Sequence, residues 1–251
     1  MAKTKVVEAK NIKKSFIVGA QTLEIIKGVN FDIESGEFII FFGPSGCGKS
    51  TLLNIVSGLE SVSEGSLKIR GEELAHYDAT QMAKFRQSKI GIVFQSFNLL
   101  KSMTIQENVA LPLLSGGETY GKALNRAEDL LVMFGLKDHL KKIPTELSGG
   151  QQQRVATARS LSTNPWIIIA DEPTGNLDSK SAEEVMSIFN TLNQKSKKTI
   201  IMVTHNPEHK VYANRVFNLK DGTIESITRN QHQVAIKDVG GFKPSEHVIG
   251  Q

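Results

Sequence analysis

Hydrophobic positions along the chain are grouped in short runs, and four of these runs are apolar without alternation. They are rich in β-branched and aromatic residues and end abruptly at polar or glycine-containing segments. Continuous apolar runs of this length are typical of strands that helices cover on both faces of a parallel sheet. We therefore predict buried strands at FIIFF (38–42), IGIVF (90–94), WIIIA (166–170) and TIIMVT (199–204).

Glycine-rich or polar segments of the kind that serve in ligand binding and catalysis follow each of the four predicted strands. In open parallel sheets, ligands bind beyond the carboxyl ends of the strands. This edge of the sheet is therefore the predicted functional site. The residues that follow the four strands are Gly43 to Thr51, Gln95, Asp171 with Glu172, and His205.

Three further patterns describe the rest of the chain. The segments 5–17 and 22–34 predict antiparallel strands that lie beside the core sheet. Residues 96 to about 160 lose strand character and show helical segments, which predicts a helical subdomain. In VFNLKDGTIESI (216–227), Asp-Gly lies between two short apolar runs and predicts a hairpin.

Length and composition place the chain among globular proteins. Its 251 residues suffice for one large or two small domains. Apolar runs such as FIIFF reach only about a quarter of the roughly 20 residues that a membrane-spanning helix needs. The N-terminus lacks the apolar core of a signal peptide, so we expect a cytoplasmic protein. The formal charge of +4 suits anionic ligands or a membrane surface, although a solvated surface explains it equally well.

The most specific motif is a glycine-rich loop between the first predicted strand and a predicted helix. It matches G-x-x-x-x-G-K-[ST], which binds nucleotide phosphates in this strand–loop–helix setting. Glycines let backbone N–H groups turn toward phosphate oxygens, and the helix directs its positive end to the same place. We expect Lys49 to reach the β- and γ-phosphates and Ser50 to bind Mg²⁺. The loop comprises Gly43, Pro44, Ser45, Gly46, Cys47, Gly48, Lys49, Ser50 and Thr51, and the helix carries Leu52, Leu53, Val56 and Leu59.

The single cysteine, Cys47, occupies a free position of this motif. One cysteine cannot form an internal disulfide, which fits a reducing compartment. We interpret Cys47 as a packing residue or tolerated filler, with a redox switch as the alternative.

Two carboxylates follow the strand WIIIA. We expect Asp171 to hold the Mg²⁺ shell, whereas Glu172 points the other way by strand alternation and polarises the attacking water. The alternative role for this acidic pair is a cap on the next helix. Asp178 and Ser179 are better placed for that cap.

For Gln95 and His205, only the neighbouring motifs favour a functional role over a structural one. Alone, each is as readily explained by a structural role. Together with the phosphate loop, they predict that Gln95 contacts the metal and water and that His205 contacts the γ-phosphate.

A second helix start with anion-binding character occurs at LSGGQ (147–151), where Ser148 is a natural N-cap. It has no lysine and lies about a hundred residues from the phosphate loop. A two-fold dimer would use both sites if each LSGGQ closed over the γ-phosphate held by the other subunit. Read alone, the motif is a capped helix preceded by a loop. The predicted ligands here are Ser148, Gly149, Gly150 and Gln151.

Taken together, these motifs resemble those of the nucleotide-binding subunits of ABC transporters. GPSGCGKST, the Gln of VFQ, LSGGQ, IIIADEP, the NLD of GNLDS and the His of VTH stand in the family's order and spacing. The resemblance runs from residue 5 to about 227. It implies an α/β P-loop NTPase fold with a RecA-like parallel core, an N-terminal antiparallel β subdomain and an inserted helical subdomain (about 96–160). It implies an ATPase domain over 1–227 and leaves 228–251 as a polar extension, either a disordered tail or a dimer-stabilising element.

The resemblance also implies roles for single residues. Glu172 becomes the catalytic base, Gln95 the coupling residue, Asp178 the dimer-facing aspartate and His205 the switch histidine. Phe16 matches the aromatic residue on which adenine stacks, although a core position explains it as well. The implied cofactors are ATP and Mg²⁺, and the implied partner is a second copy of the chain. The implied metal ligands are Ser50, Gln95 and Asp171.

Longer stretches are similar to the macrolide-efflux and lipoprotein-release group (MacB and LolD type). The group implies an integral membrane permease with four transmembrane helices per subunit, contacted through 96–109, and hence a peripheral position on the inner face of the cell membrane. Asn206 and the sequence VATARSL depart from the group's usual Asp and VAIARAL. A nucleic-acid partner is not expected, because the charge is mild and no long coiled-coil insertion is present. The alternative function is a soluble assembly ATPase, as in iron–sulfur cluster assembly.

Overall fold

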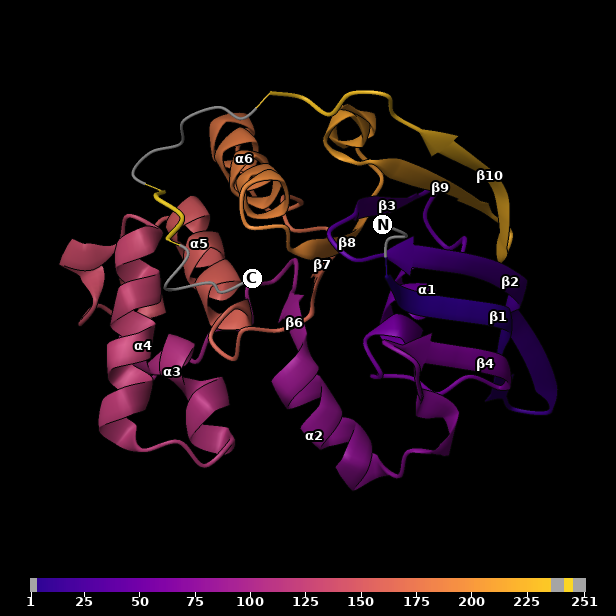
Figure 1. The fold of residues 1–251 in the computed structure, drawn as a ribbon, viewed down its shortest axis with the longest axis horizontal. Helices are drawn as coiled ribbons and strands as arrows, with labels where there is room; N and C mark the ends of the chain where they lie inside the picture. Colours follow the sequence, from indigo (N-terminus) through magenta and orange to yellow (C-terminus); the bar gives the residue numbers. More distant parts are fainter. Residues whose placement is uncertain (1–3, 236–241, 246–251) are drawn as a thin grey trace. The chain divides into compact units, whose positions relative to one another are not determined.

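The computed structural model describes residues 4–235 and 242–245 (Figure 1). The chain forms two compact units. The first unit comprises Met1–Arg86 and Thr199–Val234, and the second comprises Gln87–Lys198 and Ala235–Gln251. Within the described ranges, no helix combines the length and the apolar character needed to cross a membrane.

An antiparallel sheet forms one part of the first unit. Its strand order is β2 (Gln21–Glu34), β1 (Lys5–Val18), β4 (Glu64–Ile69) and β5 (Glu72–Glu73). β1 pairs antiparallel with both β2 and β4, and the three strands lie side by side in Figure 1. The two predicted N-terminal strands are therefore confirmed.

The parallel core of the first unit is built on β3 (Phe38–Phe42). This strand pairs in parallel with β8 (Thr199–Thr204) on one side and β9 (Arg215–Lys220) on the other. β10 (Thr223–Arg229) pairs antiparallel with β9 through a turn in which Asp221 and Gly222 have φ of 47° and 82°. The predicted strands 38–42 and 199–204 and the predicted hairpin are confirmed.

Aromatic packing joins the two sheets of the first unit. The rings of Phe31, Phe41 and Phe217 meet pairwise with centroids 5.5 to 5.9 Å apart, in edge-on or tilted geometry. Such pairs stabilise a core beyond the area that they bury. The resulting core holds β3 rigidly, and β3 carries the phosphate loop.

Helix α1 (Lys49–Val56) follows the phosphate loop and buries Leu52, Leu53 and Val56 as predicted. The prediction that this helix also carries Leu59 is wrong. The helix ends before Leu59, Gly58 turns the chain with a φ of 69°, and Leu59 is 45% exposed. Helix α2 (Ala79–Lys89) carries the chain on into the second unit.

Among its described residues, the second unit contains the other two predicted strands and four α-helices. β6 (Ile90–Val93) and β7 (Ile167–Asp171) pair in parallel. Between them in the sequence, the fully described residues 96–160 contain helices and no strand, as the sequence predicted. The helices of this unit are α3 (Ile105–Ser115), α4 (Tyr120–Met133), α5 (Gly149–Ser160) and α6 (Ser179–Gln194).

The described part of the C-terminal extension packs on its own chain. The Asn230 amide donates to the carbonyls of Lys210 and Ala213, both at 2.7 Å, within the first unit. In the second unit, the Phe242 ring packs on Phe134 at the end of α4, with centroids 4.9 Å apart. Residues 236–241 and 246–251 of the predicted extension lie outside the described residues.

Candidate functional site

In the first unit, the phosphate loop and His205 emerge from neighbouring strands. Phe42, the last residue of β3, pairs with Thr204, the last residue of β8. Gly43 and His205 therefore leave the same edge of the sheet. This arrangement follows from the parallel pairing that the apolar runs predicted.

The loop depends on glycine at three positions. Gly46 and Gly48 have φ of 79° and 98°, a conformation that side chains rarely adopt. A Cβ on Gly43 would lie 2.4 Å from the Leu219 carbonyl oxygen and 2.8 Å from the Cys47 sulfur. Cys47 is only 4% exposed, so it packs beneath the loop as predicted.

The N-terminus of α1 is open to an anion. Its N-cap is Gly48, which has no side chain to cap the helix, and its first turn contains no acidic residue. Uncapped N–H groups at a helix start carry partial positive charge. Lys49 adds a full charge at this point and is only 6% exposed. Its Nζ donates to the carbonyls of Gly43 and Pro44 at 2.9 and 2.7 Å, which holds the ammonium inside the loop.

The residues on either side of His205 contact the buried His209. The Thr204 hydroxyl oxygen accepts from the Asn206 N–H at 3.0 Å and lies 3.1 Å from His209 Nδ1. The Asn206 side chain is the N-cap of η4 (Pro207–Tyr212) and accepts from the Glu208 N–H at 3.0 Å. Its amide nitrogen then faces His209 Nε2 at 3.4 Å. An asparagine, which accepts and donates at once, suits this position, and His205 itself remains exposed.

Phe16 lies on β1 near the turn that leads to β2, and it is half-buried rather than part of the core. Lys14 Nζ is 4.9 Å from the centroid of the Phe16 ring. Lys14 is itself anchored by Glu60 at 2.8 Å and by the Ser61 carbonyl at 2.8 Å. An aromatic ring held this way at a sheet margin suits base stacking, and adenine stacking on Phe16 stays a prediction.

In the second unit, Gln95 and the Asp171–Glu172 pair come from adjacent strands. Val93 of β6 pairs with Ala170 of β7, so these polar residues follow two neighbouring strand ends. The Asn176 amide donates to the Gln95 carbonyl at 3.0 Å. A Cβ on Gly175 would lie 2.6 Å from Gln95 Nε2, so the Gln95 side chain packs directly against this glycine.

Glu172 is held in an unusual backbone conformation. β7 ends at Asp171, and Glu172 has a φ of 45° in a turn closed by a hydrogen bond of 3.0 Å from the Gly175 N–H to its carbonyl. Strand alternation therefore does not set the direction of this side chain, and that part of the sequence argument is wrong. A left-handed conformation costs on the order of 1 kcal/mol or more in a residue other than glycine, and such strain concentrates at functional sites.

The LSGGQ segment forms the start of α5, with Ser148 as the predicted N-cap. Ser148 Oγ accepts from the Gln151 N–H at 3.4 Å, and Gln151 Oε1 accepts from the Ser148 N–H at 3.0 Å. This reciprocal cap leaves the N–H groups of Gly149 and Gly150 as the remaining first-turn donors. The Gln151 amide nitrogen also lies 3.3 Å from His139 Nε2.

Asp178 lies beside the start of α5 within the same unit. It is the N-cap of α6 and accepts from the Ser181 N–H at 3.0 Å and the Ser181 hydroxyl at 2.6 Å. Both bonds lower the pKa of the Asp178 carboxyl. A Cβ on Gly150 would lie 2.8 Å from Ser181 Oγ, so glycine allows this close approach of α5 and α6.

The predicted metal ligands fit Mg²⁺ by their donor chemistry. Ser50, Gln95 and Asp171 offer hydroxyl, amide and carboxylate oxygens, the hard donors that Mg²⁺ prefers. Over the residues that the structure describes, no group of three or more His, Cys, Asp or Glu side chains forms a metal cage. A magnesium ion held by Ser50, Gln95 and Asp171 would complete its shell with phosphate oxygens and water.

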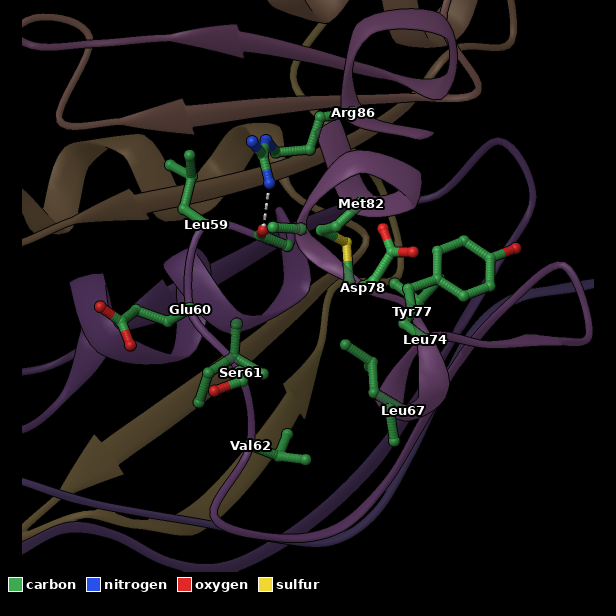
Figure 2. A pocket seen from close by; sticks show the side chains of 14 residues that line it. Leu59, Glu60, Ser61, Val62, Leu67, Leu74, Tyr77, Asp78, Met82 and Arg86 are labelled. Atoms are coloured by element: carbon green, nitrogen blue, oxygen red, sulfur yellow. Dashed lines mark hydrogen bonds between the residues drawn. The ribbon is translucent and has the colours of Figure 1, made fainter. Parts of the chain in front are cut away.

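A separate cavity lies at the C-terminal end of α1 in the first unit (Figure 2). Its volume is about 340 Å³, and it opens between β4, η1 (Leu74–His76) and α2. The Arg86 guanidinium, one of the groups that line it, donates to the Gly58 carbonyl at 2.7 Å. The residues that line it include none of those predicted to bind ATP.

Comparisons with known proteins agree with this geometry. The family model for ABC transporters matches residues 26–175. An uncharacterized ABC transporter ATP-binding protein of Methanocaldococcus jannaschii, MJ1508, is 48% identical over 221 residues, which cover 88% of this chain and 98% of that protein. The macrolide export ATP-binding/permease protein MacB of Mannheimia succiniciproducens is 44% identical over 89% of this chain but only 35% of its own length. A dimeric, post-hydrolysis structure of the ATP-binding cassette MJ0796, bound to ADP and Pi, has a TM-score of 0.82 at 41% identity and covers 89% of this chain and 98% of its own.

Proposed function

Because the chain belongs to the ABC transporter family and is an ATP-binding subunit that hydrolyses ATP, we propose that two copies close around two MgATP and drive a membrane permease. The observation that carries the proposal is the uncapped start of α1, where Lys49 is buried among loop carbonyls. This site is built for a polyphosphate. The dimeric form of the relative bound to ADP and Pi supports two copies as the working unit.

Nucleotide binding would begin in the first unit. The loop N–H groups and Lys49 hold the β- and γ-phosphates, and Phe16 stacks on adenine. Ser50, Gln95 and Asp171 would hold Mg²⁺, which neutralises charge on the phosphate oxygens when bound. Because Lys49 already donates to two carbonyls, phosphate oxygens replace existing partners and no long side chain has to be ordered anew.

Hydrolysis would require groups from both copies. Glu172 takes the proton of the attacking water, Gln95 orients that water, and His205 donates to the γ-phosphate. The other copy closes the site with Ser148 and the first-turn N–H groups of its α5.

Closure does work only if ATP binds the closed dimer more tightly than the open form. A nearly complete switch needs a difference of about 5.5 kcal/mol. Contacts to the γ-phosphate supply such a difference because ADP lacks that group, and so hydrolysis reopens the dimer.

A permease is the proposed partner because MacB, which combines ATP-binding and permease functions in one longer chain, contains this chain's counterpart as about a third of its length. We place the contact at residues 96–109, and the position of the protein on the inner face of the membrane follows from it. Asn108 is fully buried, accepts from the Leu100 N–H at 2.7 Å and donates to the Leu100 carbonyl at 3.0 Å. Leu100 is 45% exposed on this fixed segment, which gives a partner an apolar contact. Four transmembrane helices per permease subunit remain the expectation from the resemblance.

The test is Glu172→Gln, with Glu128→Gln on the exposed face of α4 as a matched control. We expect Glu172→Gln to bind ATP, to sediment as a dimer with ATP but not with ADP, and to lose turnover by about 100-fold or more. Glu128→Gln should match the wild type in both measurements. A Glu172→Gln protein that hydrolyses ATP at the wild-type rate would contradict the role of Glu172.

A further inference from the structure

Two side chains hold three backbone carbonyls of the segment that begins at Gln95. The Asn176 amide donates to the Gln95 carbonyl at 3.0 Å. The Arg159 guanidinium donates through Nη2 to the Phe97 carbonyl at 2.8 Å and through Nη1 to the Asn98 carbonyl at 2.6 Å. All five residues belong to the second unit.

The segment needs such support because its backbone is strained. Phe97 and Asn98 have φ of 58° and 50°, two successive left-handed residues that are not glycine. This conformation is unfavourable for L-residues and persists only when the surroundings impose it. Arg159 stabilises it, because the planar guanidinium donates to both carbonyl oxygens at once and so fixes their positions.

Arg159 contacts these carbonyls from a half-buried position, and burial lowers the pKa of its guanidinium. Arginine nevertheless stays charged at neutral pH. A half-buried charge that donates to two neutral carbonyls is a geometrically specific restraint. A lysine at this position would keep the charge but could not present two donors in a fixed plane.

Arg159 also lies in the last turn of α5, the helix that begins at Ser148 and Gly149. A helix of this length spans about 18 Å. Its first turn is the part proposed to meet the γ-phosphate of the other copy. One helix therefore joins that turn to the backbone on which Gln95 is mounted.

We propose that Arg159 is a positioning residue for ATP hydrolysis. It fixes the backbone that carries Gln95 and couples this segment to α5, so that closure of the dimer and placement of Gln95 occur together. Arg159 itself touches neither nucleotide nor metal in this role. The inference rests on the proposed function, because it assigns Gln95 to the metal and water.

The test compares Arg159→Lys with Arg126→Lys. Arg126 is a half-buried arginine of the same unit that donates to one carbonyl, that of Ser162, at 3.4 Å. The readouts are kcat at saturating MgATP, the Mg²⁺ concentration for half-maximal activity, and the affinity for a fluorescent ATP analogue in EDTA. We expect Arg159→Lys to lower kcat and to raise the Mg²⁺ requirement, each by about tenfold or more, with analogue affinity unchanged. Arg126→Lys should resemble the wild type in all three.

Asn176→Ala keeps the test decisive if Arg159→Lys fails to fold. Asn176 is exposed and holds the same segment through the Gln95 carbonyl, so its loss should give the same shift in Mg²⁺ requirement without unfolding the protein. Wild-type kcat and Mg²⁺ dependence in Arg159→Lys, or in Asn176→Ala where Arg159→Lys does not fold, would overturn the proposal. Failure of the proposed function looks different, since Glu172→Gln would then retain activity whatever Arg159→Lys does.

Discussion

Gly175→Ala is the substitution that tests the placement of Gln95 most selectively. A Cβ at this position would lie 2.6 Å from Gln95 Nε2 and 3.1 Å from its Cδ. The backbone of Gly175 does not require glycine, because its φ is outside the positive range. The added methyl group therefore acts on one neighbour, the Gln95 side chain.

The size of the effect follows from the distance. Ordinary contacts of a Cβ begin at 3.4 Å, so the Gln95 amide must move away by about 0.8 Å. The amide is the far end of a flexible side chain, and we expect the free energy of unfolding to change by less than about 1 kcal/mol. A misplacement approaching 1 Å at a catalytic group can lower the rate by about 100-fold. We therefore expect kcat to fall between about 10-fold and 100-fold.

The assay measures steady-state ATP hydrolysis, urea unfolding and the binding of a fluorescent ATP analogue to Gly175→Ala. Gly121→Ala on α4 is the matched control, since a Cβ there meets nothing within 4 Å. We expect it to keep full activity and to gain up to about 1 kcal/mol of stability from helix propensity. Full activity in Gly175→Ala, with Gln95 displaced, would refute the role assigned to Gln95.

Two further predictions concern the adenine contact and a helix cap. Phe16→Ala should weaken ATP binding about tenfold in a fluorescence titration, because a base–aromatic stack is lost. The control Ile17→Ala, at a side chain that is 83% exposed, should bind ATP as the wild type does. Equal affinities of Phe16→Ala and the wild type would contradict stacking of adenine on Phe16. The Thr104 hydroxyl and N–H lower the pKa of Glu107 from its ordinary 4.5, so this carboxylate stabilises the fold above that pH and its contribution is lost as the pH falls through the lowered value. The gap in unfolding free energy between the wild type and Glu107→Gln should therefore shrink from pH 7 to pH 3 in urea titrations, and a constant gap would contradict this reading.

Local chemistry made much of the fold and of the site predictable. The strands 38–42 and 199–204 have the predicted bounds because long β-branched runs are stopped by glycine or polar residues. Ser148 and Asp178 cap their helices because a side-chain acceptor before a helix start satisfies N–H groups within three residues. Each of these features depends only on a few consecutive residues, so the local sequence is enough to predict it.

Features that depend on distant partners were not predictable in this way. β4 has few apolar residues, and α2 buries only Phe85 among its described residues, so neither shows a strong period. The turn at Glu172 is set by Gly175 and by the strand that ends before it. Arg159 contacts Asn98 and Phe97, which lie 61 and 62 positions away in the sequence, and no local pattern predicts such contacts.

The central claim is that hydrolysis needs two copies of the chain, and the specific ATPase rate as a function of protein concentration tests it most directly. The account predicts a rate per subunit that rises with concentration and then levels off, with Glu172→Gln near zero throughout. A rate per subunit that is constant from the lowest concentrations, at which sedimentation shows monomers only, would contradict it.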